Sequence, residues 1–208
     1  MSLKIFLIDI NPSMCKAWKD LNLPRSITIL NQSVDTVKLN GTTVFVSPAN
    51  SLGLMRGGID NVYQKMFPNI ENDVRNEIRK IGHKMNNGDF FLPVGSALLV
   101  NISGTPGYDH LKNGQNFLIC CPSMLVPGSN ISQTTNVYWC YKSIISLIKK
   151  LPIKVDNLII PGIGTGVGGL GYQDCAREFI SALRNFDEVD ETPDLPYLVT
   201  NTQLIDHN

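Results

Sequence analysis

Two glycine-containing segments of the chain carry residue types that suit a phosphorylated ligand. The first segment, SPANSLGLMRGGID (47–60), contains Asn50 and Asp60, and the second, PGIGTGVGGLG (161–171), has six glycines among its eleven residues. A glycine in an ordered segment costs about 0.5–1 kcal/mol relative to alanine. The usual compensation is a ligand that the backbone must approach closely, with free backbone N–H groups binding its phosphates.

The polar side chains of the first segment have the chemistry to act on a sugar. The amide of Asn50 can hydrogen-bond a sugar hydroxyl, and the carboxylate of Asp60 can orient water or accept a proton from it. Because like charges repel, Asp60 should lie toward a sugar rather than toward a diphosphate. The simpler alternatives stay open: Asn50 as a turn residue, and Asp60 as an acid that stabilises a helix N-terminus.

The second segment does not match the other common explanations of a glycine-rich loop. Gly164, Gly166 and Gly169 form G-x-G-x-x-G, but the dinucleotide fingerprint should open a βαβ unit, and only about forty residues follow, with an acidic tail that contains prolines. No Lys-Ser or Lys-Thr closes the segment, which excludes a P-loop. A structural turn that needs positive φ explains one or two glycines, not six.

The elements that must position these segments are short apolar runs alternating with amphipathic stretches, which indicates an α/β fold. Each segment follows an apolar run and precedes a helix. In open α/β sheets ligands bind beyond the carboxyl ends of strands, so the two loops are expected to face one crevice. The predicted strands are 3–10, 26–31, 43–47, 95–101, 116–120 and 157–160, and the predicted helices are 12–21 with Asn11 as N-cap, 69–85, 132–150 and 172–186.

Composition excludes several classes of partner. Lys+Arg and Asp+Glu both number 18 in the 208 residues, with no basic cluster of the kind that binds duplexes. The first apolar run is too short for a signal peptide or a membrane span. Five cysteines without CxxC pairing predict reduced, buried thiols, and three scattered histidines offer no metal-ligand spacing. We therefore expect a cytoplasmic or nuclear protein with no cofactor, no metal, no nucleic-acid partner and no membrane partner.

Both segments resemble the ligand loops of the macro domain family. SPANSLGLMRGGID followed by NVYQKMFP resembles the first loop, in which a strand ends in Asn-Ala-Ala-Asn before a glycine run, an aliphatic residue and Asp. IPGIGTGVGGLG resembles the second loop, and PVGSALLV and FLICCP resemble the strands between them. The resemblance implies a three-layer α/β/α macro-domain-like fold with a mixed central sheet. It implies one macro-like domain over 1–208, with its core at about 26–186, an integral strand and helix at 1–25, and an acidic tail at 187–208.

The family binds ADP-ribose, so the resemblance assigns roles to individual positions. Asn50 matches the residue that holds the distal ribose, and Asp60 matches the acid that positions or activates water there, which makes these two the candidate catalytic residues. The matching diphosphate and ribose ligands are Gly57, Gly58, Ile59, Gly164, Thr165, Gly166, Val167, Gly168 and Gly169.

The chain departs from the family pattern at several of these positions. Ser47 replaces the first Asn, and Arg56 stands in the glycine run, where it either contacts a phosphate or faces solvent. Gly168 stands where many members have an aromatic residue against the distal ribose. The usual adenine-binding Asp is absent from the second strand, which leaves Gln32 or Asp9 as candidates, with an N-cap or loop role open for Asp9. In the loop after FLICC, Ser123 and Met124 either line the cleft or have no role.

The resemblance implies ADP-ribose or a derivative as ligand, an ADP-ribosylated protein as a further partner, and a hydrolase acting at the distal ribose. The candidate substrates are ADP-ribose 1″-phosphate, O-acetyl-ADP-ribose and ADP-ribosylated protein. A non-catalytic reader of ADP-ribose is the alternative, which Gly168 and the missing first Asn favour. A nucleotide or RNA-end binder is a third interpretation, against which the absent basic patch argues.

Overall fold

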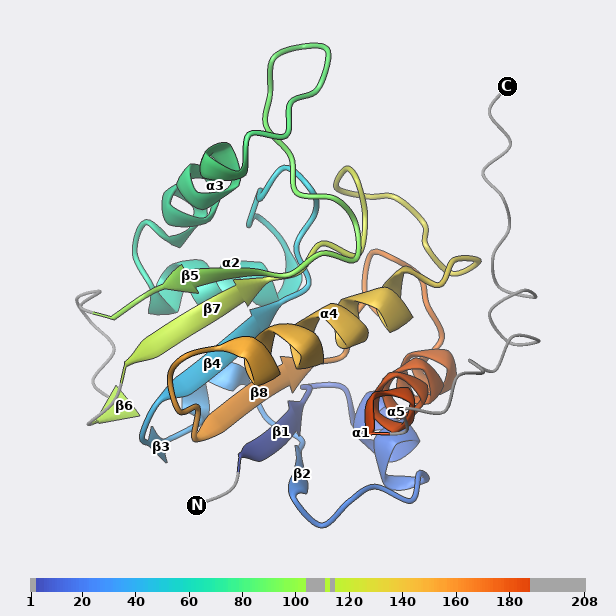
Figure 1. Ribbon diagram of the computed structural model, residues 1–208. Helices are drawn as coiled ribbons and strands as arrows, with labels where there is room; N and C mark the ends of the chain where they lie inside the picture. The colour runs from blue at the N-terminus through green and yellow to red at the C-terminus, as the bar shows by residue number, and fades with distance from the viewer. Residues whose placement is uncertain (1–2, 104–110, 113–114, 188–208) are drawn as a thin grey trace.

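The computed structural model describes residues 3–103, 111–112 and 115–187 (Figure 1). The acidic tail predicted at 187–208 lies outside these residues, except for Asp187, which ends the last helix. No helix in the described part is long and apolar enough to cross a bilayer.

The central sheet has six strands: β1 (Lys4–Ile8), β2 (Ile27–Leu30), β4 (Thr43–Ser47), β5 (Leu98–Asn101), β7 (Asn116–Cys120) and β8 (Asn157–Pro161). Their order is β2-β1-β8-β4-β7-β5, and all neighbours are parallel except β5, which runs antiparallel to β7. β4 and β8 are buried along their whole length, as expected of parallel strands covered on both faces. A separate parallel pair, β3 (Leu39–Asn40) and β6 (Leu111–Lys112), was not predicted from the sequence.

Helices cover both faces of the sheet, so the predicted three-layer α/β/α fold is confirmed (Figure 1). One face carries α1 (Pro12–Lys19), α4 (Asn136–Lys150) and α5 (Tyr172–Asp187). The other face carries the 3₁₀ turn η1 (Val34–Thr36), α2 (Gly58–Met66) and α3 (Ile70–Ile81). Each layer of helices buries its own apolar cluster against the sheet.

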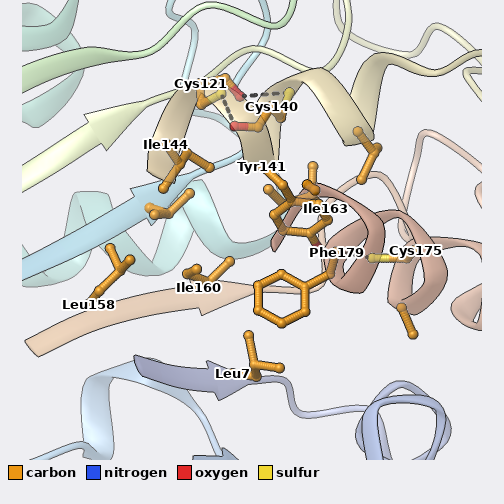
Figure 2. Packing of buried hydrophobic residues seen from close by; sticks show 14 of the residues in the cluster. Leu7, Cys121, Cys140, Tyr141, Ile144, Leu158, Ile160, Ile163, Cys175 and Phe179 are labelled. Atoms are coloured by element: carbon orange, nitrogen blue, oxygen red, sulfur yellow. Dashed lines mark hydrogen bonds between the residues drawn. The ribbon is translucent and has the colours of Figure 1, made fainter. Parts of the chain in front are cut away.

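The larger cluster lies between the sheet and the helices α1, α4 and α5 (Figure 2). Leu7 and Ile160 project from the strands toward Phe179 on α5, whose ring meets that of Tyr141 on α4 edge to face with centroids 5.2 Å apart. Burial of apolar side chains of this size contributes about 1.5–3 kcal/mol each, so this face fixes β8, whose carboxyl end carries the second glycine loop.

The prediction of reduced, buried thiols is confirmed. All five cysteines are free and buried, and burial raises the pKa of the Cys121 thiol well above its usual range. The Cys121 thiol donates to the carbonyl of Cys140 at 3.6 Å (Figure 2). The five residues are Cys15, Cys120, Cys121, Cys140 and Cys175.

Two helix boundaries differ from the prediction by four residues. The helix predicted at 69–85 ends at Ile81, because Gly82 adopts a left-handed conformation with φ 81° and caps it. Met85 therefore lies outside the helix, and Ile81, the last helical residue, is exposed. The helix predicted at 132–150 begins at Asn136, because the preceding residues form hydrogen-bonded turns.

Glu178 is a buried acid on α5, the helix that follows the second loop. Its side chain is 2% exposed, and its Oε2 has no hydrogen-bond partner among the described residues. Burial raises the pKa of this carboxyl to about 7, against the opposing effect of a hydrogen bond from the backbone of Tyr138. The folded state therefore favours the protonated acid.

Replacing Glu178 with glutamine is expected to stabilise the protein at pH 8 but not at pH 4. Because the folded pKa is raised from 4.5 to about 7, the wild-type free energy of unfolding falls as pH rises through this window. The loss is on the order of 3 kcal/mol at most, and glutamine does not ionise. Urea unfolding of both proteins from pH 4 to pH 8 measures the difference. A constant difference across that range would contradict the assignment.

Candidate functional site

A cavity of about 900 Å³ opens at the carboxyl ends of β1, β4, β7 and β8. Both glycine-containing loops line it, which places the two segments on one crevice as their positions after strands predicted. The predicted site residues that line the cavity are Asp9, Gln32, Asn50, Gly57, Gly58, Ile59, Asp60, Gly164, Thr165, Gly166, Val167 and Gly168.

Gly169 is the predicted ligand residue that does not line the cavity. Its backbone has φ +71°, and its N–H donates to the carbonyl of Gly166 at 3.0 Å. This N–H closes a turn of the second loop and is not available to a ligand.

Residues of both loops that line the cavity have unpaired backbone donors. α2 begins at Gly58 with Gly57 as N-cap and no side-chain cap, and the N–H groups of Gly58 and Ile59 donate no hydrogen bond within the described residues. In the second loop, the N–H groups of residues 165–168 likewise donate no hydrogen bond to any described residue. Orphan donors at a helix N-terminus and in a glycine loop form an anion-binding concavity.

Asp60 is buried at the floor of the first loop. It lies in the first turn of α2, is 7% exposed, and accepts a hydrogen bond from the Ser47 hydroxyl at 2.6 Å. Burial raises the pKa of this carboxyl to about 7, the Ser47 bond opposes the shift, and the negative charge of Glu71 adds to it. A carboxyl with this pKa can exchange a proton near neutral pH.

Sequence reasoning missed the role of Ser47, because it treated this residue only as the replacement of the family's first Asn. Ser47 ends β4 and faces the first turn of α2, so its hydroxyl meets Asp60 across the loop. The usable signal was the pairing of a hydroxyl at a strand end with the acid at the start of the next helix.

Asn50 lies in the cavity wall, but its side chain holds its own loop. Its amide oxygen accepts from the N–H groups of Leu52 at 3.2 Å and Leu54 at 3.3 Å, and its Nδ2 donates to the carbonyl of Leu54 at 2.7 Å. These bonds use both acceptor sites of the oxygen and one of the two amide hydrogens. The turn role left open for Asn50 is therefore observed, and one amide hydrogen remains for a ligand.

A second acid anchors the first loop from α3. The Oε2 of Glu71 accepts from the N–H of Met55 at 2.9 Å and from Gln64 at 3.2 Å, and its Oε1 meets Arg56 at 3.3 Å. Gln64 also donates to the carbonyl of Met55. This network fixes the backbone that leads into α2, and it was not predicted from the sequence.

Most glycines of the second loop have a packing reason that the ligand explanation did not foresee. A Cβ on Gly168 would lie 2.7 Å from the carbonyl oxygen of Gly164, and one on Gly162 would lie 2.7 Å from Asp9 Oδ2. Gly164 itself has φ +74° and packs against Ile131. Of the six glycines, only Gly166 has open space at its Cβ position and no positive φ. Positive φ and contacts within the protein therefore account for glycines that the sequence analysis attributed to a ligand.

Both candidates for adenine lie at the β1 and β2 end of the cavity. Asp9 accepts from the N–H of Asn11 at 2.8 Å, and burial raises the pKa of its carboxyl. Gln32 lines the same cavity. Asn11, the predicted N-cap of α1, accepts from Ser13 and donates to the Tyr172 hydroxyl at 2.6 Å. The cavity-lining role of Asn11 and Tyr172 was missed.

A third loop, residues 121–135, forms the remaining wall. Ser123 and Met124 line the cavity, and Ser123 is fully buried rather than exposed. The N–H of Ile131 donates to the carbonyl of Gly168 at 2.8 Å, which ties this loop to the second one. In the described part, no group of three or more His, Cys, Asp or Glu side chains could hold a metal ion.

Comparisons with known proteins agree with this architecture. The model of a family described as Macro domain matches residues 46–179. An uncharacterized protein of Aquifex aeolicus is 32% identical over 144 residues, which span 69% of this chain and 74% of that protein.

Solved structures share the fold at low identity. The macrodomain of Mycobacterium tuberculosis DarG superposes with a TM-score of 0.51 at 20% identity, covering 71% of this chain and 84% of that one. A mutant of the Oceanobacillus iheyensis macrodomain, solved with ADPR, gives a TM-score of 0.54 at 18% identity and 77% coverage of both chains. The family model extends from the end of β4 into α5, over both loops of the cleft, and the chain belongs to the macro domain family.

Proposed function

We propose that the cleft binds ADP-ribose, with the diphosphate between the two glycine-containing loops. The observation that carries the proposal is the set of unpaired N–H groups of Gly58, Ile59 and residues 165–168 around one cavity. A diphosphate has acceptors enough to pair with donors on both sides. Structures of the Oceanobacillus iheyensis macrodomain with ADPR and with ADP support the choice of nucleotide.

The two ends of the cleft suit the two ends of this ligand. Asp9 and Gln32 supply acceptors for the adenine amino group beside the apolar Ile8 and Val34. In this proposal the distal ribose lies beside Asp60, so that the carboxyl faces a sugar rather than the diphosphate, as charge repulsion requires.

We further propose that the protein hydrolyses an ADP-ribose derivative. Asp60, with a pKa raised to about 7 by burial, orients a water and takes its proton as the water attacks at or next to the anomeric carbon of the distal ribose, or the phosphate or acyl group attached there. The bond between the ribose and that group breaks, and the displaced oxygen takes up a proton. The loop N–H groups stabilise the charge that develops on the substrate. The substrates considered are ADP-ribose 1″-phosphate, O-acetyl-ADP-ribose and ADP-ribosylated protein.

One observation favours the alternative of a non-catalytic reader. The resemblance places Asn50 on the distal ribose, but its side chain already makes three hydrogen bonds to the backbone of Leu52 and Leu54. A distal ribose held by fewer contacts can be bound without being oriented for attack.

Binding and turnover can be tested separately. In a thermal-shift panel of ADP-ribose, ADP, AMP and NAD, we expect the largest rise in Tm with ADP-ribose, because ligand binding to the folded state stabilises it. No shift with any of the four would contradict the binding proposal. Incubation with each derivative and analysis of products then separates a hydrolase from a reader, which binds and forms no product.

A further inference from the structure

Arg56 is the one cationic side chain among the described residues that line the cavity. It stands two residues before the start of α2, next to the unpaired N–H groups of Gly58 and Ile59. Its side chain is 72% exposed and meets Glu71 at 3.3 Å. An exposed ion pair of this kind contributes little to stability, so the guanidinium can exchange its partner easily.

Glu71 does not depend on Arg56 for its position. Its other carboxylate oxygen is fixed by the N–H of Met55 and by Gln64, so the loop keeps its anchor when Arg56 moves. Glu71 lowers the positive potential at Arg56 in the free protein, and a doubly charged diphosphate in the cleft competes with this single carboxylate.

We propose that Arg56 is a specificity-determining residue that leaves Glu71 and binds the phosphates of the ligand beside the N-terminus of α2. This inference rests on the proposed function of the cleft. The guanidinium presents a planar fork of donors that matches phosphate oxygens, which a lysine ammonium does not. Arg56 then favours ligands with two phosphates over ligands with one or none, and it leaves recognition of the adenine end unchanged.

Isothermal titration with ADP-ribose, AMP and adenosine tests this role in four proteins: wild type, Arg56→Ala, Arg56→Lys and Arg75→Ala. Arg75 is the matched control, because it also acts electrostatically on Glu71 but does not line the cavity. We expect Arg56→Ala to weaken ADP-ribose binding about tenfold or more, the usual effect of losing a hydrogen bond to a charged group. Adenosine binding should stay unchanged, and Arg56→Lys should keep part of the ADP-ribose affinity.

Salt dependence supplies a readout that a purely structural role would not move. The wild-type affinity for ADP-ribose should fall with added NaCl more steeply than that of Arg56→Ala, because a charge contact is screened. If wild type binds ADP-ribose and Arg56→Ala matches Arg75→Ala in affinity and in salt slope, the inference is overturned and the proposed function stands. If wild type does not bind ADP-ribose, the proposed function itself fails.

Discussion

Replacing Asp60 with alanine is expected to reduce hydrolysis of the ADP-ribose derivative by about 10²–10⁴-fold, the usual contribution of a general base. ADP-ribose binding should change little, because the donors proposed to hold the diphosphate are backbone N–H groups of both loops. Steady-state kinetics and titration of ADP-ribose on the same protein measure the two effects. Unchanged turnover would remove Asp60 from the mechanism.

The pH profile adds a second check on Asp60. With a pKa of about 7, the carboxylate is available as a base above neutral pH, so wild-type kcat should fall as pH decreases through 7. Ser47→Ala removes the hydrogen bond that lowers this pKa, so the fall should then occur at higher pH. A profile that Ser47→Ala leaves unmoved would contradict the Ser47–Asp60 pairing.

Asp60→Asn separates stability from catalysis. The folded pKa of Asp60 is raised from 3.8 to about 7, so ionisation of this buried group costs stability that the protein retains at low pH and loses as pH rises through that window. Asparagine removes the ionisation and can still accept from Ser47. The variant should therefore be inactive and yet more resistant to unfolding than wild type at pH 8.

Gly168→Ala is expected to damage both the second loop and ligand binding. The new Cβ would lie 2.7 Å from the backbone oxygen of Gly164, and a backbone atom cannot rotate away as a side chain can. Overpacking of this kind costs about 1–3 kcal/mol. The displaced loop should also lose hydrogen bonds to the diphosphate, which weakens ADP-ribose binding about ten- to a hundredfold.

Gly166→Ala is the matched control in the same loop. Gly166 has open space at its Cβ position, so the free energy of unfolding of this variant should stay close to that of wild type. Urea unfolding and titration of ADP-ribose measure both variants. Equal stability of the two variants would contradict the packing explanation of Gly168.

The sequence sufficed for most of the fold because its apolar runs and stripes are regular. The strands at 43–47 and 116–120 were predicted at their observed bounds, and Asn11 caps α1 as its position before Pro12 indicated. Helix ends were less predictable. The apolar stripe of α3 continues in the sequence to Met85, but the left-handed conformation of Gly82 ends the helix earlier.

The site was predicted in its outline and not in its internal contacts. The order of the two loops after their strands was enough to place them on one cavity. The Ser47–Asp60 bond, the Glu71 anchor of Met55 and the use of Asn50 by its own loop join residues whose pairing depends on the loop conformation. Glycine content alone also cannot distinguish a position that contacts a ligand from one that packs against its own chain, as Gly166 and Gly168 show.

A crystal structure of the protein grown with excess ADP-ribose would show whether the two loops together bind the diphosphate. We expect phosphate oxygens within hydrogen-bond distance of the N–H groups of Gly58 or Ile59 on one side and of residues 165–168 on the other. A ligand bound elsewhere, or a diphosphate that contacts neither loop, would contradict it.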